Sequence, residues 1–315
     1  MSAHGHAHGH AHAHAHGHAH ADDPSAPARE ADRRALRIAL AITLTFLGVE
    51  VVGGWLAGSL ALLADAAHMA TDAFGLGLAL LAARLAGRRP TWGRTFGHRR
   101  AEVLAALANG VLLGVVAIQV AIEAAGRIGA PPAVQGRLML GVAAAGLAAN
   151  VAAAAVLARA GSGGLNVRAA LWHVLGDALG SLGALAAAAG ILAFGWRWAD
   201  PAVAIAIAVL ILISSWRLVR ESLDVLMEGT PAHVDVDALI AAIRAVPGVV
   251  DVHDLHVWTL TSGYHALSAH VDVQPDADTH AVLHILSDLA QKRFHVAHTT
   301  FQLEHVEPLL QIEEL

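Results

Sequence analysis

Residues 63–76 read LADAAHMATDAFGL, a segment apolar enough for a membrane helix that nevertheless contains Asp65, His68 and Asp72. An ionisable side chain at membrane depth is energetically costly, so such residues usually face protein or a water-filled cavity and have a function. Residues 171–180, LWHVLGDALG, repeat the His-x-x-x-Asp spacing with His173 and Asp177. Residues four apart on a helix project from one face, so each segment presents an imidazole and a carboxylate together.

The composition around these two segments is that of a membrane protein. Of the 315 residues, 56% are hydrophobic and only 15% are charged, and the mean hydropathy is +0.55. The absence of cysteine excludes disulfides and thiol redox chemistry, so a metal site must use His nitrogen with carboxylate or carbonyl oxygen. The net charge of -6 counts the 22 His as neutral, and it would change strongly on acidification or metal loading.

Six apolar runs are long enough to cross a hydrocarbon layer of about 30 Å. We expect them within a transmembrane domain of residues 35–220, near residues 36–57, 60–84, 101–125, 137–158, 168–193 and 201–219. Six spans put both ends on the same side of the membrane. Arginine is concentrated in the N-terminal flank and in the second-to-third and fourth-to-fifth connections, so the positive-inside rule predicts that both termini are cytoplasmic. No cleaved signal peptide is expected before the first span.

The two ends of the chain differ from this apolar part. Residues 1–34 are expected to be a disordered cytoplasmic tail and linker, because alternating His, Gly and Ala cannot bury a core. We interpret the tail as a metal-collecting segment rather than an expression tag, since tags are usually uninterrupted His runs; its histidines are His4, His6, His8, His10, His12, His14, His16, His18 and His20. Residues 221–315 show a helix-strand-strand-helix-strand pattern, which predicts a cytoplasmic α+β domain with its helices on one face of a sheet.

The two His-Asp pairs suggest a metal site within the membrane. If the second and fifth spans pack together, His68, Asp72, His173 and Asp177 offer two nitrogens and two oxygens, a donor set that suits tetrahedral Zn²⁺. The alternative is that no metal binds and each His only forms a hydrogen bond with the Asp of its own helix. That alternative does not explain why two separate spans have the same spacing. Asp65 extends the stripe by one turn and Glu50 lies on the first span; lining a transport path and a purely structural role are equally favoured for both.

Three functional classes follow from such a site. A metal transporter would place it at the middle of its path and expose it alternately to the two sides. An intramembrane metalloenzyme would need an open metal position beside a base, and the chain contains no His-Glu-x-x-His. A metal-sensing membrane scaffold, whose cytoplasmic domain binds zinc without transport, is the alternative to transport. Neither an organic cofactor nor a nucleic-acid partner is expected.

Nearly the whole chain resembles the cation diffusion facilitators, and among them the zinc-exporting bacterial members. The similarity is carried by SLALLADAAHMATD at 59–72, TFGHRRAE at 95–102, WHVLGDALGSLG at 172–183, WADP at 198–201 and VHDLHVWTLTSG at 252–263. It implies a homodimer in a bacterial plasma membrane that exports divalent metal, zinc first and Cd²⁺, Co²⁺ or Ni²⁺ as further candidates, against protons. It also implies a metallochaperone-like, ferredoxin-like terminal domain.

The resemblance further implies specific metal ligands. It makes His68, Asp72, His173 and Asp177 the transport site. A loop site of some members uses two His flanking a Phe-Gly pair; here the second position is His98, whereas the first is Arg94. In the terminal domain the implied ligands are His253, His270, His280, His305 and Glu307. His253, His270 and His305 fall on the three expected strands, so a shared sheet would bring them together, with His280 at the start of the second helix.

Overall fold

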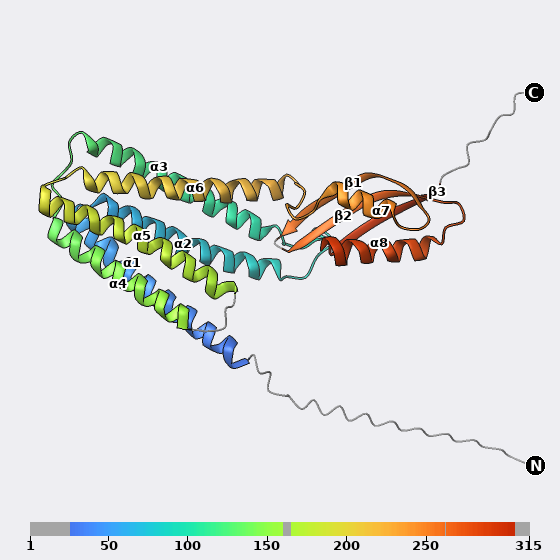
Figure 1. Ribbon diagram of the computed structural model, residues 1–315, viewed down its shortest axis with the longest axis horizontal. Helices are drawn as coiled ribbons and strands as arrows, with labels where there is room; N and C mark the ends of the chain where they lie inside the picture. Colours follow the sequence, from blue (N-terminus) through green and yellow to red (C-terminus); the bar gives the residue numbers. More distant parts are fainter. Residues whose placement is uncertain (1–25, 160–164, 262, 306–315) are drawn as a thin grey trace, which may run out of the picture.

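The computed structural model describes residues 26–159, 165–261 and 263–305. Its first part is a bundle of six long helices, with a smaller α+β domain at one end of the bundle (Figure 1). Every one of the six contains a stretch apolar enough to cross a membrane. The helices are α1 (Ala26–Ala57), α2 (Leu60–Ala86), α3 (Ala101–Ile128), α4 (Gly136–Arg159), α5 (Leu165–Phe194) and α6 (Ala199–Leu226).

The six predicted spans are therefore present, and the first and last of their helices extend beyond the apolar runs expected from the sequence. Residues 26–34, expected to belong to a disordered linker, form the first turns of α1. The expected boundary after residue 220 falls inside α6, which continues to Leu226. In both cases charged residues close to the apolar run were interpreted as its end, although charged side chains at a helix end extend readily into water.

The helices pack through small residues and leave large apolar side chains outside. α3 packs along α6, α4 lies between α1 and α5, and α2 contacts α1, α3, α5 and α6. Gly146 illustrates the close approach, since a Cβ there would lie only 2.5 Å from the ring of Phe46. Trp55, Phe74 and Leu179 are all more than half exposed on the outer surface. An outer surface of this kind fits hydrocarbon rather than water.

The terminal domain has the predicted order of elements, α7 (Val236–Arg244), β1 (Val249–Thr261), β2 (Tyr264–Val273), α8 (Thr279–Phe294) and β3 (His298–His305). Strand β2 lies at the centre of the sheet, antiparallel to β1 and parallel to β3. α7 and α8 contact each other and share with the sheet a core that includes the fully buried Leu239, Leu267 and Leu286. Both helices begin at an Asp, Asp235 and Asp278, whose side chain accepts hydrogen bonds from backbone N–H groups of the first turn.

The turn end of the β1-β2 hairpin contacts the start of α3. Thr261 Oγ1 donates a hydrogen bond to Glu102 Oε2 at 2.5 Å. The Arg99 guanidinium lies 3.8 Å from the centre of the Tyr264 ring, a cation-π contact. These contacts join the terminal domain to the same end of the bundle at which α3 begins.

Candidate metal centres

The four predicted membrane ligands meet where α2 contacts α5. Asp72 Oδ2 is 3.6 Å from His68 Nε2 on its own helix and 3.4 Å from His173 Nε2 on α5. His173 Nε2 is also 3.7 Å from Asp177 Oδ2. The structure thus brings both His-Asp pairs into one group, with His173 and Asp72 at its centre.

This geometry fits a small metal ion. Two ligand atoms on one tetrahedral zinc ion, each about 2.0–2.2 Å from the metal, lie about 3.4 Å apart. The nitrogen-oxygen distances within the group are close to that spacing. Asp177 is almost completely buried, and its Oδ2 has no hydrogen-bond partner among the described residues. A buried carboxylate oxygen left unpaired is costly, and a bound cation would remove that cost.

A cavity of about 750 Å³ connects this group with the end of the bundle that carries the terminal domain. Asp72 and His173 form part of its wall, together with residues of α1, α3 and α6. Glu102, which binds the terminal domain through Thr261, lines the same cavity. The side chains of Asp72 and His173, 24% and 49% exposed, are therefore accessible from the domain end.

At the opposite end of the bundle, a buried carboxylate joins α6 to α2. Asp200, fully buried at the start of α6, accepts hydrogen bonds from Ser59 Oγ at 2.6 Å, Leu60 N at 2.9 Å and Ala61 N at 3.1 Å. An anion is well placed there because the first N–H groups of a helix have no partner within it and carry partial positive charge. The contact ties the beginning of α2 to α6 on the far side of the metal group.

Asp65 and Glu50 form a second buried acidic pair between α1 and α2. They are only 2% and 1% exposed, and their carboxyl groups are close enough to interact electrostatically. In the described part of the chain, no donor reaches either oxygen of Glu50 or Oδ2 of Asp65. Asp65 also lies against Gly180, where a Cβ would be 2.8 Å from Asp65 Oδ1. Since Gly180 follows Asp177 by about one turn of α5, the pair lies beside the metal group on the side away from the terminal domain.

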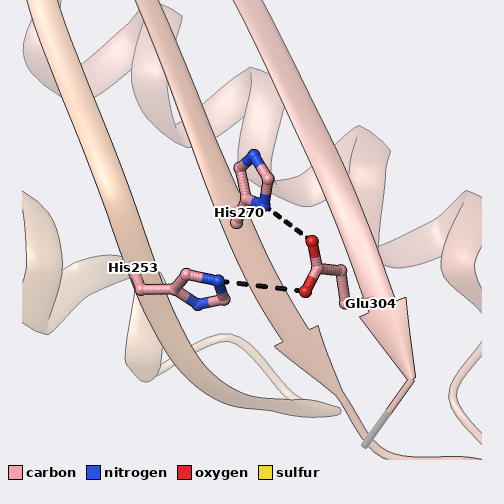
Figure 2. A group of neighbouring side chains, drawn as sticks. All are labelled: His253, His270 and Glu304. Atoms are coloured by element: carbon pink, nitrogen blue, oxygen red, sulfur yellow. Dashed lines mark hydrogen bonds and ion pairs between the residues drawn. The ribbon is translucent and has the colours of Figure 1, made fainter.

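A separate group of potential ligands lies on the sheet of the terminal domain. His253 on β1, His270 on β2 and Glu304 on β3 place one ligand atom each within 4.8 Å of one another (Figure 2). The imidazole N–H of His270 donates from Nδ1 to Glu304 Oε1 at 2.6 Å, and His253 Nε2 is 3.8 Å from Glu304 Oε2. The hydrogen bond from His270 lowers the pKa of the Glu304 carboxyl, which keeps it ionised and ready to bind a cation.

Sequence reasoning placed His253 and His270 here but missed Glu304. The register pairs His253 with His270, and His270 with Gln302. Alternation puts Glu304 on the same face as Gln302, so the strand pattern contained the signal. Asp272 and Asp254 also approach the group, at 3.7 Å from His253 Nδ1 and 3.9 Å from His270 Nε2.

The remaining sequence-predicted residues lie elsewhere. Among the described residues the sheet group contains neither His280, whose ring centre is 4.8 Å from that of His284, nor His305, which is exposed at the end of β3. His98 lines a cavity of about 1060 Å³ between the second-to-third connection and β1, and its Nδ1 has no partner in that described region. Glu307 and the tail histidines between His4 and His20 lie outside the described residues.

Comparison with known proteins agrees with this architecture. Residues 36–227 match the cation efflux transmembrane domain, and residues 231–306 match the cytoplasmic domain of cation efflux proteins. The metal cation efflux system protein CzcD of Cupriavidus metallidurans is 43% identical over 277 residues, which cover 87% of each chain. The zinc transporter ZitB of Escherichia coli is 42% identical over 274 residues, 86% of this chain and 87% of ZitB.

Two further similarities concern an antiporter and a solved domain. A cadmium, cobalt and zinc/H(+)-K(+) antiporter of Bacillus velezensis is 39% identical over 280 residues, 87% of this chain and 89% of the antiporter. The solved metal-bound C-terminal domain of the CzcD transporter from Cupriavidus metallidurans is 38% identical, with 22% of this chain and 99% of that chain covered and a TM-score of 0.22. The two family matches and the relatives that align over most of the chain show that this integral membrane protein is a transporter of the cation efflux family, the cation diffusion facilitators.

Proposed function

We propose that this transporter exports cytoplasmic Zn²⁺ in exchange for protons through the group of His68, Asp72, His173 and Asp177. The observation that carries the proposal is the joining of two imidazoles and two carboxylates at the inner end of a cavity. Two nitrogens and two oxygens form a donor set that suits zinc, whereas a set of carboxylates alone would suit harder ions. Relatives named as zinc or as cadmium, cobalt and zinc transporters support the same class of substrate.

Proton coupling follows from the chemistry of the ligands. Metal binding requires neutral imidazoles and ionised carboxylates, so protons and metal compete for one set of atoms. Imidazole supplies the sensitivity, because its ordinary pKa of about 6.5 is close to physiological pH. Protons arriving from the outer side would displace the metal, and their release to the cytoplasm would restore the empty ligands.

The closed far end and the open cavity suggest how access alternates. In this conformation metal enters from the end that carries the terminal domain, while the bonds from Ser59 and α2 to Asp200 close the other end. Release would require these bonds to open. Asp65 and Glu50 lie on that side of the site, and a buried pair of carboxylates without donors needs a proton or a cation between them. We assign them to the exit path.

We further propose the surroundings of the transporter. Arginine-rich connections on the side of the terminal domain support a topology in a bacterial inner membrane with both termini on the cytoplasmic side. The terminal domain would bind regulatory zinc at His253, His270 and Glu304 and, as the cytoplasmic domain of a cation efflux protein, mediate a homodimer. His280, His305, Glu307 and the tail histidines remain candidates for collecting or binding metal there.

Zinc flux into proteoliposomes under an imposed pH gradient tests the proposal. We expect wild-type protein to accumulate zinc when the compartment receiving metal is acidic, and Asp72→Ala to abolish this flux. Glu123→Ala is the matched control, because its carboxylate pairs with Arg127 within α3, away from the cavity. Binding of zinc without flux in the wild type would instead favour the metal-sensing scaffold, and near-normal flux in a folded Asp72→Ala protein would contradict the site.

A further inference from the structure

Three histidines of the terminal domain gather away from both groups described above. They are His233 between α6 and α7, His265 on β2, and His295 directly after α8. The ring centre of His233 is 4.7 Å from that of His265 and 6.4 Å from that of His295. Two imidazoles bound to one tetrahedral zinc ion have ring centres about 5 Å apart, given zinc-nitrogen distances of about 2.0–2.1 Å. The first separation is close to that value, and the second is about 1.4 Å longer. As they stand, the three side chains do not place one nitrogen each within 4.8 Å of one another, as the ligand atoms of His253, His270 and Glu304 do.

His265 is oriented as a metal ligand usually is. Its Nδ1 is 3.1 Å from Thr259 Oγ1 across the β1-β2 hairpin, which leaves Nε2 available. Ligating histidines commonly have their second nitrogen fixed by such a hydrogen bond. Burial and the neighbouring His233 lower the pKa of the His265 imidazole, which favours its neutral form. A neutral imidazole binds metal without first releasing a proton.

The other two histidines are placed by the backbone but have room to move. His295 ends α8 in a left-handed conformation with φ of 56°, and its N–H donates to Ala290 O. Such a conformation is uncommon for a residue other than glycine, and here the cap of α8 holds it. The side chains of His233 and His295 are exposed, so a rotation about their side-chain bonds can close the longer separation without burying or unpacking anything.

We propose that His233, His265 and His295 form a third metal site, which takes a divalent transition-metal ion of the imidazole-binding class, with Zn²⁺ as the best fit. Three imidazole nitrogens and one open position for water complete a tetrahedral shell. The site is distinct from that of His253, His270 and Glu304. His265 and His270 are an odd number of residues apart on β2, so they face opposite sides of the sheet, about 17 Å apart along the strand.

A metal ion at this site would act on the part of the domain that contacts the bundle. It would join the chain before α7, the β1-β2 hairpin and the end of α8 through one ion. His265 follows Tyr264, on which Arg99 stacks, and its partner Thr259 is two residues from Thr261, which binds Glu102. Occupancy of the site would therefore stiffen the hairpin where it meets α3.

Residue-resolved histidine modification of the full-length protein in detergent micelles tests the site. Diethyl pyrocarbonate is applied with and without micromolar Zn²⁺, and the modified peptides are quantified by mass spectrometry. We expect His233, His265 and His295 to be protected several-fold, all with the same zinc midpoint, and to gain no protection from Mg²⁺. This readout follows individual side chains, so zinc bound by the tail or by the membrane site does not obscure it.

Variants then show whether the three histidines bind one zinc ion together or are protected independently of one another. His265→Ala should abolish the protection of His233 and His295, and His233→Ala, a substitution of an exposed side chain, should abolish that of His265 and His295. His256→Ala is the matched control, an exposed histidine of the same domain, and should leave the protection unchanged, as should His253→Ala combined with His270→Ala. The proposal fails if zinc protects none of the three histidines, protects them with different midpoints, or still protects the remaining two in both single variants.

Discussion

At the scale of single residues, the membrane site combines exposure and burial within one ligand set. His173 and Asp72 face the cavity, whereas Asp177 is only 2% exposed and its Oδ2 accepts no hydrogen bond from the described residues. A buried group that is unfavourable in the empty protein is typical of functional sites, where stability is given up for activity. A cation bound at the proposed site would therefore offset an existing cost.

Replacement of Asp177 by asparagine should separate these two effects. Asp177→Asn removes a buried charge while keeping the shape of the side chain, so we expect the metal-free protein to be more stable, by about 1 kcal/mol, and zinc transport to be lost. Thermal unfolding in detergent with and without zinc measures the first effect and proteoliposome flux the second. Zinc should raise the unfolding temperature of the variant less than that of wild type. An equal zinc-induced increase in both proteins would exclude Asp177 as a ligand, and Glu123→Gln provides the control for charge removal alone.

At the scale of elements, the end of α2 opposite the terminal domain depends on one side chain from another helix. Ser59 caps α2 by accepting from Leu62 N, and Asp200 of α6 accepts from Ser59 and from two further N–H groups. The capping serine could be predicted from its position before an apolar helix. Its partner Asp200 in α6 could not be predicted. The two residues are 141 positions apart, and the sequence does not show which helix ends meet in the folded protein.

Removal of that carboxylate should loosen the closed end. Asp200→Ala leaves the Ser59 hydroxyl and the N–H groups of Leu60 and Ala61 without their buried acceptor, so we expect a loss of about 2–4 kcal/mol of stability. Ser59→Ala should cost less, about 1 kcal/mol. Thermal unfolding in detergent compares the two variants. If Asp200→Ala does not fold, the milder Ser59→Ala variant still tests the contact. Unfolding of both variants at the wild-type temperature would show that the contact does not hold this end together.

The stability of the protein should also depend on pH, because His265 in the β1-β2 hairpin titrates differently in the folded and unfolded chain. Because the folded pKa of His265 lies below its ordinary value, the unfolded chain takes up this proton first as the pH falls. The stability contributed by the neutral imidazole is complete above the unfolded value of about 6.5 and decreases as the pH falls toward the lower folded value. In metal-free protein, His265→Gln should therefore lose less stability than wild type between neutral and mildly acidic pH. His256→Gln is the control, and identical pH profiles for His265→Gln and wild type would contradict this assignment.

The elements themselves could be predicted further than their contacts. Apolar run lengths predicted all six membrane helices, and alternation predicted the order of the terminal domain, because both patterns are local. The four His and Asp residues could be paired in advance because two spans repeat one spacing. Glu304 was missed because a carboxylate on the third strand joins the site only through the register between β2 and β3. The gathering of His233, His265 and His295 likewise depends on three separate segments of the chain.

At the scale of the whole molecule, Glu102 links the two parts of the transporter. Its carboxylate lines the cavity that leads to the membrane site and accepts a hydrogen bond from Thr261 at the end of β1. Tyr264 on the adjoining strand stacks beneath Arg99. The strand that begins at Tyr264 also contains His270, so the proposed metal site on the sheet and the wall of the cavity share one hairpin. Coupling between two sites requires such an element, whose arrangement both sites can bias.

A double-mutant cycle tests whether this hairpin transmits the effect of zinc. His253→Ala combined with His270→Ala should lower the zinc transport rate several-fold, because the terminal domain can no longer bind metal and favour the transporting arrangement. Thr261→Val combined with Tyr264→Ala removes the hydrogen bond to Glu102 and the stacking of Arg99, and should also lower the rate. If the effect of zinc on the sheet reaches the membrane site through the hairpin, the variant with all four substitutions should transport no more slowly than Thr261→Val combined with Tyr264→Ala. Once the contacts of Thr261 and Tyr264 are lost, removal of the sheet histidines has no further effect. Proteoliposome flux at saturating zinc gives the four rates required. Rate losses that simply multiply would show that metal on the sheet acts on the membrane site by a route that does not pass through Thr261 and Tyr264.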